Sequence, residues 1–188
     1  MADADESDED LMGRYARGDA AAFALLYRRH EMRLWRYLER NTGNRATADE
    51  LMQEVWFAVA RDAPRYQPSA RFTTWLFTIA HNRMVDMVRA TRPQVSLEAV
   101  YEEVETVAAQ RDPGGEPLAA VVARDQSSAL AGALGQLPDE QRVAFLLQAE
   151  GDLSVEEIAV ITHSSFETSK SRLRYARTKL RQLLSEHR

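Results

Sequence analysis

Residues 154–181 read SVEEIAVITHSSFETSKSRLRYARTKLR. Two short helical patterns meet there at a polar turn, and the second carries Lys170, Arg174, Arg177 and Arg181. Because residues three and four apart share a face of an α-helix, these side chains form one basic stripe. A cationic helix that follows a short helix is typical of a helix-turn-helix. A basic stripe is also typical of a solvated helix face, so the charge by itself leaves both interpretations open.

A second stripe gives the later helix an inner face. Its members are mostly apolar and recur at helical spacing: Ser169, Leu173, Ala176, Leu180 and Leu184. The S-x-x-E spacing of a capping box predicts helix starts at Ser154, with Glu157, and at Ser164, with Glu167. Two capped helices at this separation favour DNA binding over a solvated face.

The composition excludes several classes of protein. The chain has 188 residues, 45% of them hydrophobic, which is enough for one large or two small cores. It contains no cysteine, and its four histidines are scattered, so we expect neither a disulfide nor a metal site, and no cofactor. No apolar run approaches the roughly 18 residues of a membrane span, and the acidic start does not resemble a signal peptide. We expect a cytoplasmic protein without direct membrane insertion.

The net charge of −5 is strongly patterned. Residues 11–93 and 166–188 have a net positive charge, whereas residues 1–10 and 94–165 are acidic. Two basic surfaces separated by acidic segments predict two contacts with nucleic acid, because the acidic segments would be repelled by phosphate.

Helical periodicity without strand-like alternation predicts an all-α fold with two helical domains. We expect a disordered acidic N-terminus at 1–9, a first domain at 10–92, a flexible acidic linker at 93–128 and a second domain at 129–188. The helices predicted in the first domain span 10–16, 19–41, 46–62 and 71–91, and the linker is expected to hold a short helix near 97–109.

Local signals place several helix ends and a loop. Asp19, Thr47 and either Thr73 or Thr74 are expected to begin helices, and Gly43 to end one. Pro64 and Pro68 bracket a loop, because each disfavours helix at the residue before it.

Residues 65–92 interleave aromatic and cationic side chains. Proteins that bind single strands use exposed aromatic rings as platforms for unstacked bases, so this composition favours contact with opened DNA. Aromatic residues at helical spacing are also typical of a core, and we expect at least Phe77 and Ile79 to be buried.

Two groups of motifs resemble bacterial sigma factors. ADELMQEVW at 48–56 and FTTWLFTIAHN at 72–82 resemble region 2 of that family. LPDEQRVAFLL from 137, LSVEEIA from 153 and TSKSRL from 168 resemble its region 4. The likeness covers residues 10–92 and 130–184, and the two-domain layout resembles the extracytoplasmic-function group.

The resemblance implies a fold of a region-2 helical bundle and a region-4 helix-turn-helix. It also implies a protein that binds core RNA polymerase through the β and β′ subunits, directs it to particular promoters and helps to melt them, without catalysing a reaction. An anti-sigma factor is implied as a further partner. On the positions that match, Glu50, Gln53 and Glu54 would face the β′ coiled coil.

The resemblance assigns DNA contacts to both domains. The minus-ten element and its melted junction would be contacted by Tyr66, Gln67, Ser69, Arg71, Trp75, Asn82, Arg83 and Arg89, with a flipped base held by the loop 66–71. The minus-thirty-five element would be contacted by Thr168, Lys170, Ser171, Arg172, Arg174, Tyr175 and Arg177. His163 and Glu167 depart from residues frequent in the family, which predicts an unusual promoter preference.

Two other functions are compatible with parts of the sequence. A stand-alone helix-turn-helix regulator would explain residues 130–184 but would leave segment 65–92 without a role. A small helical hydrolase would need His81 with Asp86 or Glu50, yet the sequence has no activated nucleophile, Gly-rich phosphate loop or metal-ligand spacing.

Overall fold

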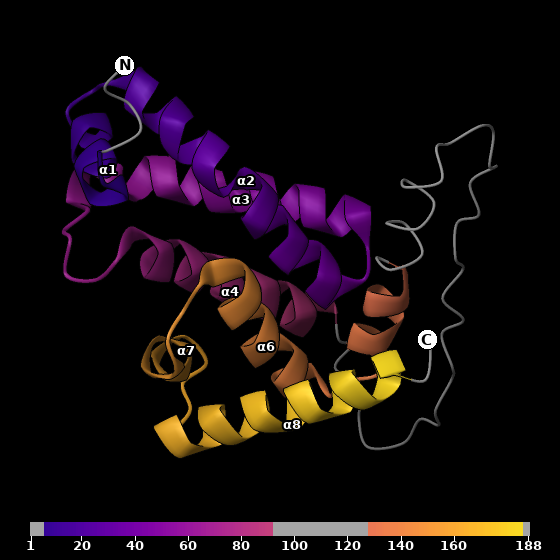
Figure 1. Ribbon diagram of the computed structural model, residues 1–188. Helices are drawn as coiled ribbons and strands as arrows, with labels where there is room; N and C mark the ends of the chain where they lie inside the picture. Colours follow the sequence, from indigo (N-terminus) through magenta and orange to yellow (C-terminus); the bar gives the residue numbers. More distant parts are fainter. Residues whose placement is uncertain (1–5, 92–127, 186–188) are drawn as a thin grey trace.

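The computed structural model describes residues 6–91 and 128–185, and within these ranges the regular structure is helical (Figure 1). The prediction of an all-α fold is confirmed. The elements are α1 (Asp8–Ala16), α2 (Ala20–Thr42), α3 (Arg45–Asp62), the 3-10 helix η1 (Ala63–Arg65), α4 (Phe72–Thr91), a helical segment at 128–135, α6 (Asp139–Gly151), α7 (Val155–Ile161) and α8 (Phe166–Ser185). Apart from residue 128, the predicted linker and the short helix expected in it lie outside the described residues.

The first half of the chain packs α1 to α4 around a shared apolar core. Leu26, Leu34, Leu51 and Leu76 are fully or almost fully buried there. Their burial follows from helical spacing, which collects the apolar side chains of each helix on one face. Phe77 is 1% exposed, as expected, whereas Ile79 is only partly buried.

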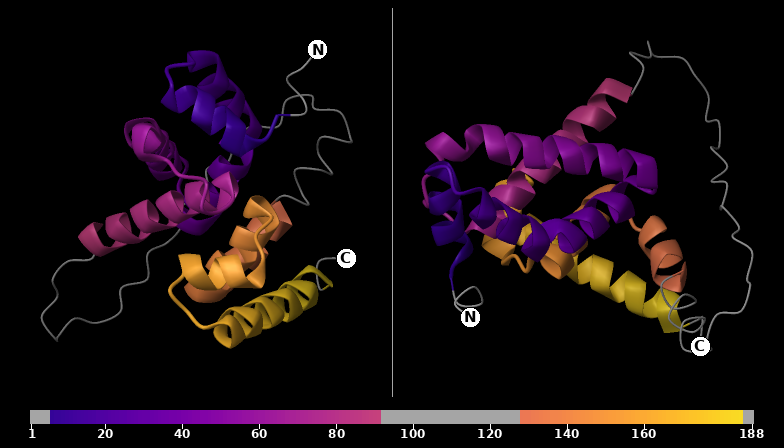
Figure 2. Two further views of the ribbon diagram at one scale, coloured as in Figure 1. Left: turned by 90° about the vertical axis from the view of Figure 1, so that its left-hand side faces the viewer. Right: turned by 90° about the horizontal axis from the view of Figure 1, so that it is seen from above.

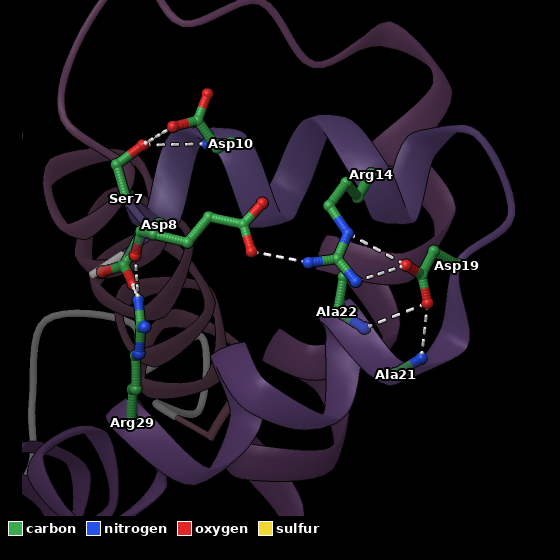
Figure 3. Close-up of polar contacts among 9 residues, drawn as sticks. Ser7, Asp8, Asp10, Arg14, Asp19, Ala21, Ala22 and Arg29 are labelled. Atoms are coloured by element: carbon green, nitrogen blue, oxygen red, sulfur yellow. Dashed lines mark hydrogen bonds and ion pairs between the residues drawn. The ribbon is translucent and has the colours of Figure 1, made fainter. Parts of the chain in front are cut away.

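The acidic N-terminus differs from its predicted disorder over the residues that the structure describes. The first helix begins at Asp8, and the Ser7 side chain caps it by accepting a hydrogen bond from the Asp10 amide at 3.1 Å. The Asp8 carboxylate lies 2.8 Å from Arg29 Nη1 and 2.6 Å from His30 Nε2 of α2 (Figure 3 shows the contact with Arg29). These partners are more than 20 residues away, so the local composition predicted disorder where tertiary contacts order the chain.

Some helix ends follow the local signals and others do not. Asp19 caps α2 by accepting from the amides of Ala21 and Ala22, and Gly43 ends it with a φ of 64°. The prediction that Thr47 starts the next helix is wrong. Asn44 is the cap, and its side chain accepts a hydrogen bond from the Thr47 amide at 3.1 Å.

The helix-turn-helix is formed by α7 and α8. The capping box of Ser154 and Glu157 is present with both of its hydrogen bonds, at 3.2 and 2.8 Å. The second predicted box is wrong, because the Ser165 side chain, one residue later than expected, accepts from the Thr168 amide at 3.1 Å. Ser164 instead lies 2.8 Å from Ser169 through the two hydroxyl groups.

The turn and the inner face of α8 complete this unit. His163 adopts a left-handed conformation with a φ of 50°, which is uncommon for a residue other than glycine. Four of the five predicted inner residues of α8 are buried, and Leu183 is buried at the end of the stripe in place of Leu184, which is partly buried.

The two halves of the described chain pack against each other. Figure 1 and Figure 2 show α6 lying between α2 and α8, with α7 beside α4. Glu150 of α6 is 5% exposed, and its carboxylate contacts Arg36 Nε at 3.0 Å and Arg40 Nη1 at 2.7 Å, both from α2. A linker of the predicted length, residues 93–128, would allow the halves either to contact each other or to spread apart, and this structure has the closed arrangement.

Candidate nucleic-acid and protein interfaces

The basic stripe of α8 lies on the outer surface. Lys170, Arg174, Arg177 and Arg181 are all exposed, while Ser169 on the inner side is fully buried. This separation confirms the predicted amphipathic helix. The stripe presents four cations along one side of the helix, a distribution suited to phosphates and to acceptor groups on bases.

Aromatic rings support two of these cations. The Arg174 guanidinium lies 4.9 Å from the centre of the Tyr175 ring, and Lys170 Nζ lies 5.7 Å from that of Phe166. Tyr175 is 55% exposed and Phe166 is 40% exposed. The start of α8 therefore offers an exposed surface of cations and rings, in which Phe166 was not predicted from the sequence.

Other residues assigned to this helix lie differently. Arg172 points away from the stripe, has a side chain that is 20% exposed and pairs with Glu140 of α6. Arg177 donates a hydrogen bond to Gln148, which also lies in α6. Thr168 is exposed and Ser171 is half-buried. The structure thus brings Lys170, Arg174 and Arg177 to one face, with the Tyr175 ring in contact with Arg174, and does not bring Arg172 there.

An aromatic cluster lies where the loop 66–71 meets α4. Tyr66 packs on Trp75 with ring centres 5.0 Å apart, and both rings lie near Phe72. Burial, together with the charges of Glu9 and Asp8, raises the pKa of Tyr66 to about 12. Phe72 is fully buried, whereas Tyr66 and Trp75 are half-buried, so the cluster joins the core to the surface.

The remaining residues assigned to this surface follow the loop and α4. Gln67, Ser69 and Arg71 are exposed in the loop. Trp75, Asn82 and Arg89 are spaced by seven residues and therefore share one side of α4, along about 20 Å of helix. Asn82 and Arg89 are exposed and Arg83 is half-buried. The loop and this side of α4 form an elongated surface of rings, amides and cations.

The second half of the chain touches this surface. Arg71 Nη1 donates to the Asp152 carbonyl at 3.2 Å and lies 3.7 Å from the Glu157 carboxylate, and Thr74 donates to the same carboxylate. Burial alone would raise the pKa of Glu157, but hydrogen bonds from Thr74 and Ser154 and the charge of Arg71 lower it. Arg71 is therefore engaged within the chain in the closed arrangement.

The outer side of α3 has a different character. Glu50, Gln53 and Glu54 are exposed together, and Phe57 extends this face with an exposure of 72%. The neighbouring groove between α2 and α3, of about 640 Å³, is lined by Phe23, Tyr27, Trp35, Asp49, Met52, Gln53, Trp56 and Phe57. Phe57 was not among the residues predicted for this face, although its position three residues after Glu54 places it there.

The side chains that a hydrolase would use are not assembled. His81 contacts the Tyr37 hydroxyl at 3.2 Å, and burial with the nearby His163 lowers its pKa to about 4. Asp86 and Glu50 are exposed. Across the described residues, no group of three or more His, Cys, Asp or Glu is arranged to hold a metal ion, and no helix could cross a membrane.

Comparison with protein families gives two matches along the chain. Residues 26–94 match sigma-70 region 2, and residues 127–180 match sigma-70 region 4. The first match contains the α3 face and the α4 surface, and the second contains the helix-turn-helix.

Individual relatives agree with these matches. The chain is 36% identical over 177 residues to the ECF RNA polymerase sigma factor SigE of Mycolicibacterium smegmatis, covering 92% of this chain and 66% of that protein. It is 33% identical over 175 residues to the RNA polymerase sigma factor CarQ of Myxococcus xanthus, covering 93% and 96%.

Solved structures show the same fold. CnrH, in complex with the cytosolic domain of CnrY, aligns with a TM-score of 0.68 at 25% identity and covers 96% of this chain and 99% of that one. The sigma factor RpoE from Bartonella quintana, in complex with the anti-sigma factor NepR, aligns with a TM-score of 0.58 at 23% identity, covering 82% and 91%.

Proposed function

The chain belongs to the extracytoplasmic-function group of sigma-70 factors, and on that premise we propose that it binds core RNA polymerase and directs promoter-specific initiation of transcription. The observation that carries the proposal is that two exposed surfaces suited to binding DNA lie on separate halves of the chain. One combines rings and cations along α4, and the other is the basic stripe of α8. A bipartite promoter requires two such contacts.

The α4 surface suits the minus-ten element. Unstacked bases gain about 1–3 kcal/mol each by stacking on aromatic side chains, which offsets part of the cost of opening the duplex. We assign Tyr66, Gln67, Ser69, Arg71 and the α4 residues Trp75, Asn82, Arg83 and Arg89 to this element. In the closed arrangement, Nη1 of Arg71 contacts Asp152 and Glu157, while the side chain is 52% exposed.

The α3 face suits the polymerase. Glu50, Gln53 and Glu54 present acidic and amide groups to a basic coiled coil of the β′ subunit, and Phe57 adds apolar area beside them. We propose the β and β′ subunits and promoter DNA as partners, an anti-sigma factor as a regulator, and no reaction catalysed by the chain itself. The activity would take place in the cytoplasm, with the polymerase.

Transcription in vitro tests the proposal. Purified chain, core polymerase and a library of genomic promoters are expected to give transcripts that depend on both promoter elements and on the added chain. Transcripts that are the same with and without the chain would contradict the proposal. A footprint of the free chain on a palindrome, without polymerase, would favour a stand-alone regulator.

Substitution of the α8 stripe is expected to relax recognition of the minus-thirty-five element. Lys170→Ala or Arg174→Ala should cost about 1–3 kcal/mol on the preferred element and less on altered ones, because a cation paired with base acceptors discriminates by about that amount. Binding of the holoenzyme to a panel of single-base variants measures this difference.

Lys179 provides the matched control for those substitutions. It is an exposed cation of the same helix, nine residues after Lys170, and therefore lies half a turn away from the stripe. Lys179→Ala is expected to leave the sequence preference unchanged. An equal loss on every base variant for Lys170→Ala and Arg174→Ala would identify both as phosphate contacts instead.

A further inference from the structure

The start of α4 is capped by a carboxylate from the other end of the first half. The Phe72 amide donates a hydrogen bond of 2.6 Å to Glu9 Oε1, across 63 positions of sequence. The first amides of a helix have no partner within the helix, and a negative charge is favourable beside them. Thr73 and Thr74, the predicted starts of this helix, are instead buried inside it. Glu9 therefore satisfies the Phe72 amide at the point where the loop 66–71 joins α4.

Glu9 is itself held in place by the attachment of α1 to α2. Asp8 pairs with Arg29 and His30, and Arg14 bridges Glu6 at 2.5 Å and Asp19 at 2.6 Å. Figure 3 shows the contacts of Asp8 with Arg29 near the start of α1 and of Arg14 with Asp19 near its end. Ion pairs near both ends of α1 hold it against α2 and the turn before α2, which keeps the Glu9 carboxylate beside the Phe72 amide.

The other end of the loop is held by packing. Tyr66 lies against Trp75 and Phe72, and its amide donates to the Ala63 carbonyl at 3.1 Å. Between these two ends, residues 67–71 are exposed, with a short internal hydrogen bond of 2.7 Å from the Ser69 amide to the Gln67 carbonyl. The loop thus has an aromatic anchor at its entry, a carboxylate anchor at its exit and an open middle.

We propose that Glu9 is a positioning residue for base recognition in the minus-ten element, acting through the loop and not by touching DNA. A loop already held in its binding shape loses less conformational freedom when a base enters it. The Glu9 charge is oriented towards the positive end of α4, so its role is to hold the loop while exposed residues such as Gln67 and Arg71 face the DNA. This inference rests on the proposed role of the loop as the site of the flipped base.

The test compares two substitutions of Glu9 in the full chain bound to core polymerase. Glu9→Ala removes the acceptor and is expected to lower open-complex formation roughly 5-fold, the change that the typical cost of a lost helix cap corresponds to. It should also flatten the preference at one or two minus-ten positions. Glu9→Gln keeps a carbonyl oxygen as the acceptor and is expected to stay within about threefold of the unmodified chain.

The readouts separate a positioning role from a general loss of structure. Open complexes are measured on promoters with single changes at every minus-ten position and, separately, in the minus-thirty-five element. Affinity for core polymerase and preference in the minus-thirty-five element should not change. Asp10→Ala is the matched control, since Asp10 is an acidic residue of the same helix whose side chain contacts Ser7 and not α4.

Each outcome decides between distinct conclusions. Unchanged minus-ten preference in Glu9→Ala, while the unmodified chain discriminates, would overturn the role of Glu9 and leave the proposed function standing. Equal losses at both promoter elements, or a failure of Glu9→Gln to restore activity, would also overturn it. If the unmodified chain does not discriminate among minus-ten bases, the proposed role of the loop fails, and the inference fails with it.

Discussion

Replacing Arg36 and Arg40 together by alanine is expected to separate the two halves of the chain. Both guanidinium groups contact the carboxylate of Glu150, which is 5% exposed. A buried charge that loses its partners costs about 3–5 kcal/mol. Here the chain can avoid that cost, because moving the halves apart returns Glu150 to water. The penalty should therefore shift the population from the closed to the open arrangement.

Distance measurement between two labels checks this expectation. The chain contains no cysteine, so single cysteines at exposed positions, Ala46→Cys in α3 and Thr178→Cys in α8, allow specific spin or fluorescence labelling. The double arginine variant should show a longer and broader distance distribution. Because the proposed promoter-binding surfaces lie on different halves, this contact sets their separation in the free chain.

A control substitution isolates the ion pairs from a general loss of charge. Arg28 is an exposed arginine of the same helix, and Arg28→Ala should keep the short distance. If the double variant also keeps it, the apolar contacts between the halves are sufficient by themselves, and the buried ion pairs do not maintain the closed arrangement.

Phe77→Ala is expected to lower the free energy of unfolding by about 3–5 kcal/mol, the usual cost of removing a buried aromatic ring. Phe77 is 1% exposed and packs edge-on against Tyr37, with ring centres 5.3 Å apart at 73°. It also lies at the junction of the halves, 3.5 Å from where a Cβ on Gly151 would be. Unfolding in urea, followed by circular dichroism, measures the loss.

Phe57→Ala is the matched control, because it removes the same ring from a position that is 72% exposed. Its effect on stability should stay within about 0.5 kcal/mol. Since Phe57 lies on the face proposed to bind polymerase, the same substitution should weaken binding to the core enzyme. A similar loss of stability for both variants would contradict the burial on which this prediction rests.

Much of the fold could be predicted because its signals are local. The basic stripe of α8, the capping box of Ser154 and Glu157 and the end of α2 at Gly43 each depend on residues within one or two helical turns, and all three are present. The exposure of Glu50, Gln53 and Glu54 follows from the same periodicity.

The wrong predictions have two kinds of cause, namely neighbouring residues that can serve as caps and tertiary contacts with residues far away in the sequence. The prediction of Thr47 and Ser164 as caps is wrong because Asn44 and Ser165, a few residues or one residue away, offer an equivalent oxygen and form the caps. Composition predicted a disordered start, whereas Asp8 finds its partners in α2. The sequence does not distinguish Arg172 from the other cations of α8, but in the structure Arg172 pairs with Glu140 of α6.

By itself, the sequence determined an all-helical chain of the sigma-70 type with a cationic helix-turn-helix, because helix formation and amphipathicity depend on residues three and four apart. Tertiary structure alone decided that Glu9 caps α4, that Glu150 joins two arginines of α2, and that Arg71 meets Glu157. These contacts connect residues 63 to 114 positions apart. A pattern in sequence shows which side chains share a helix face, but only packing shows which faces meet.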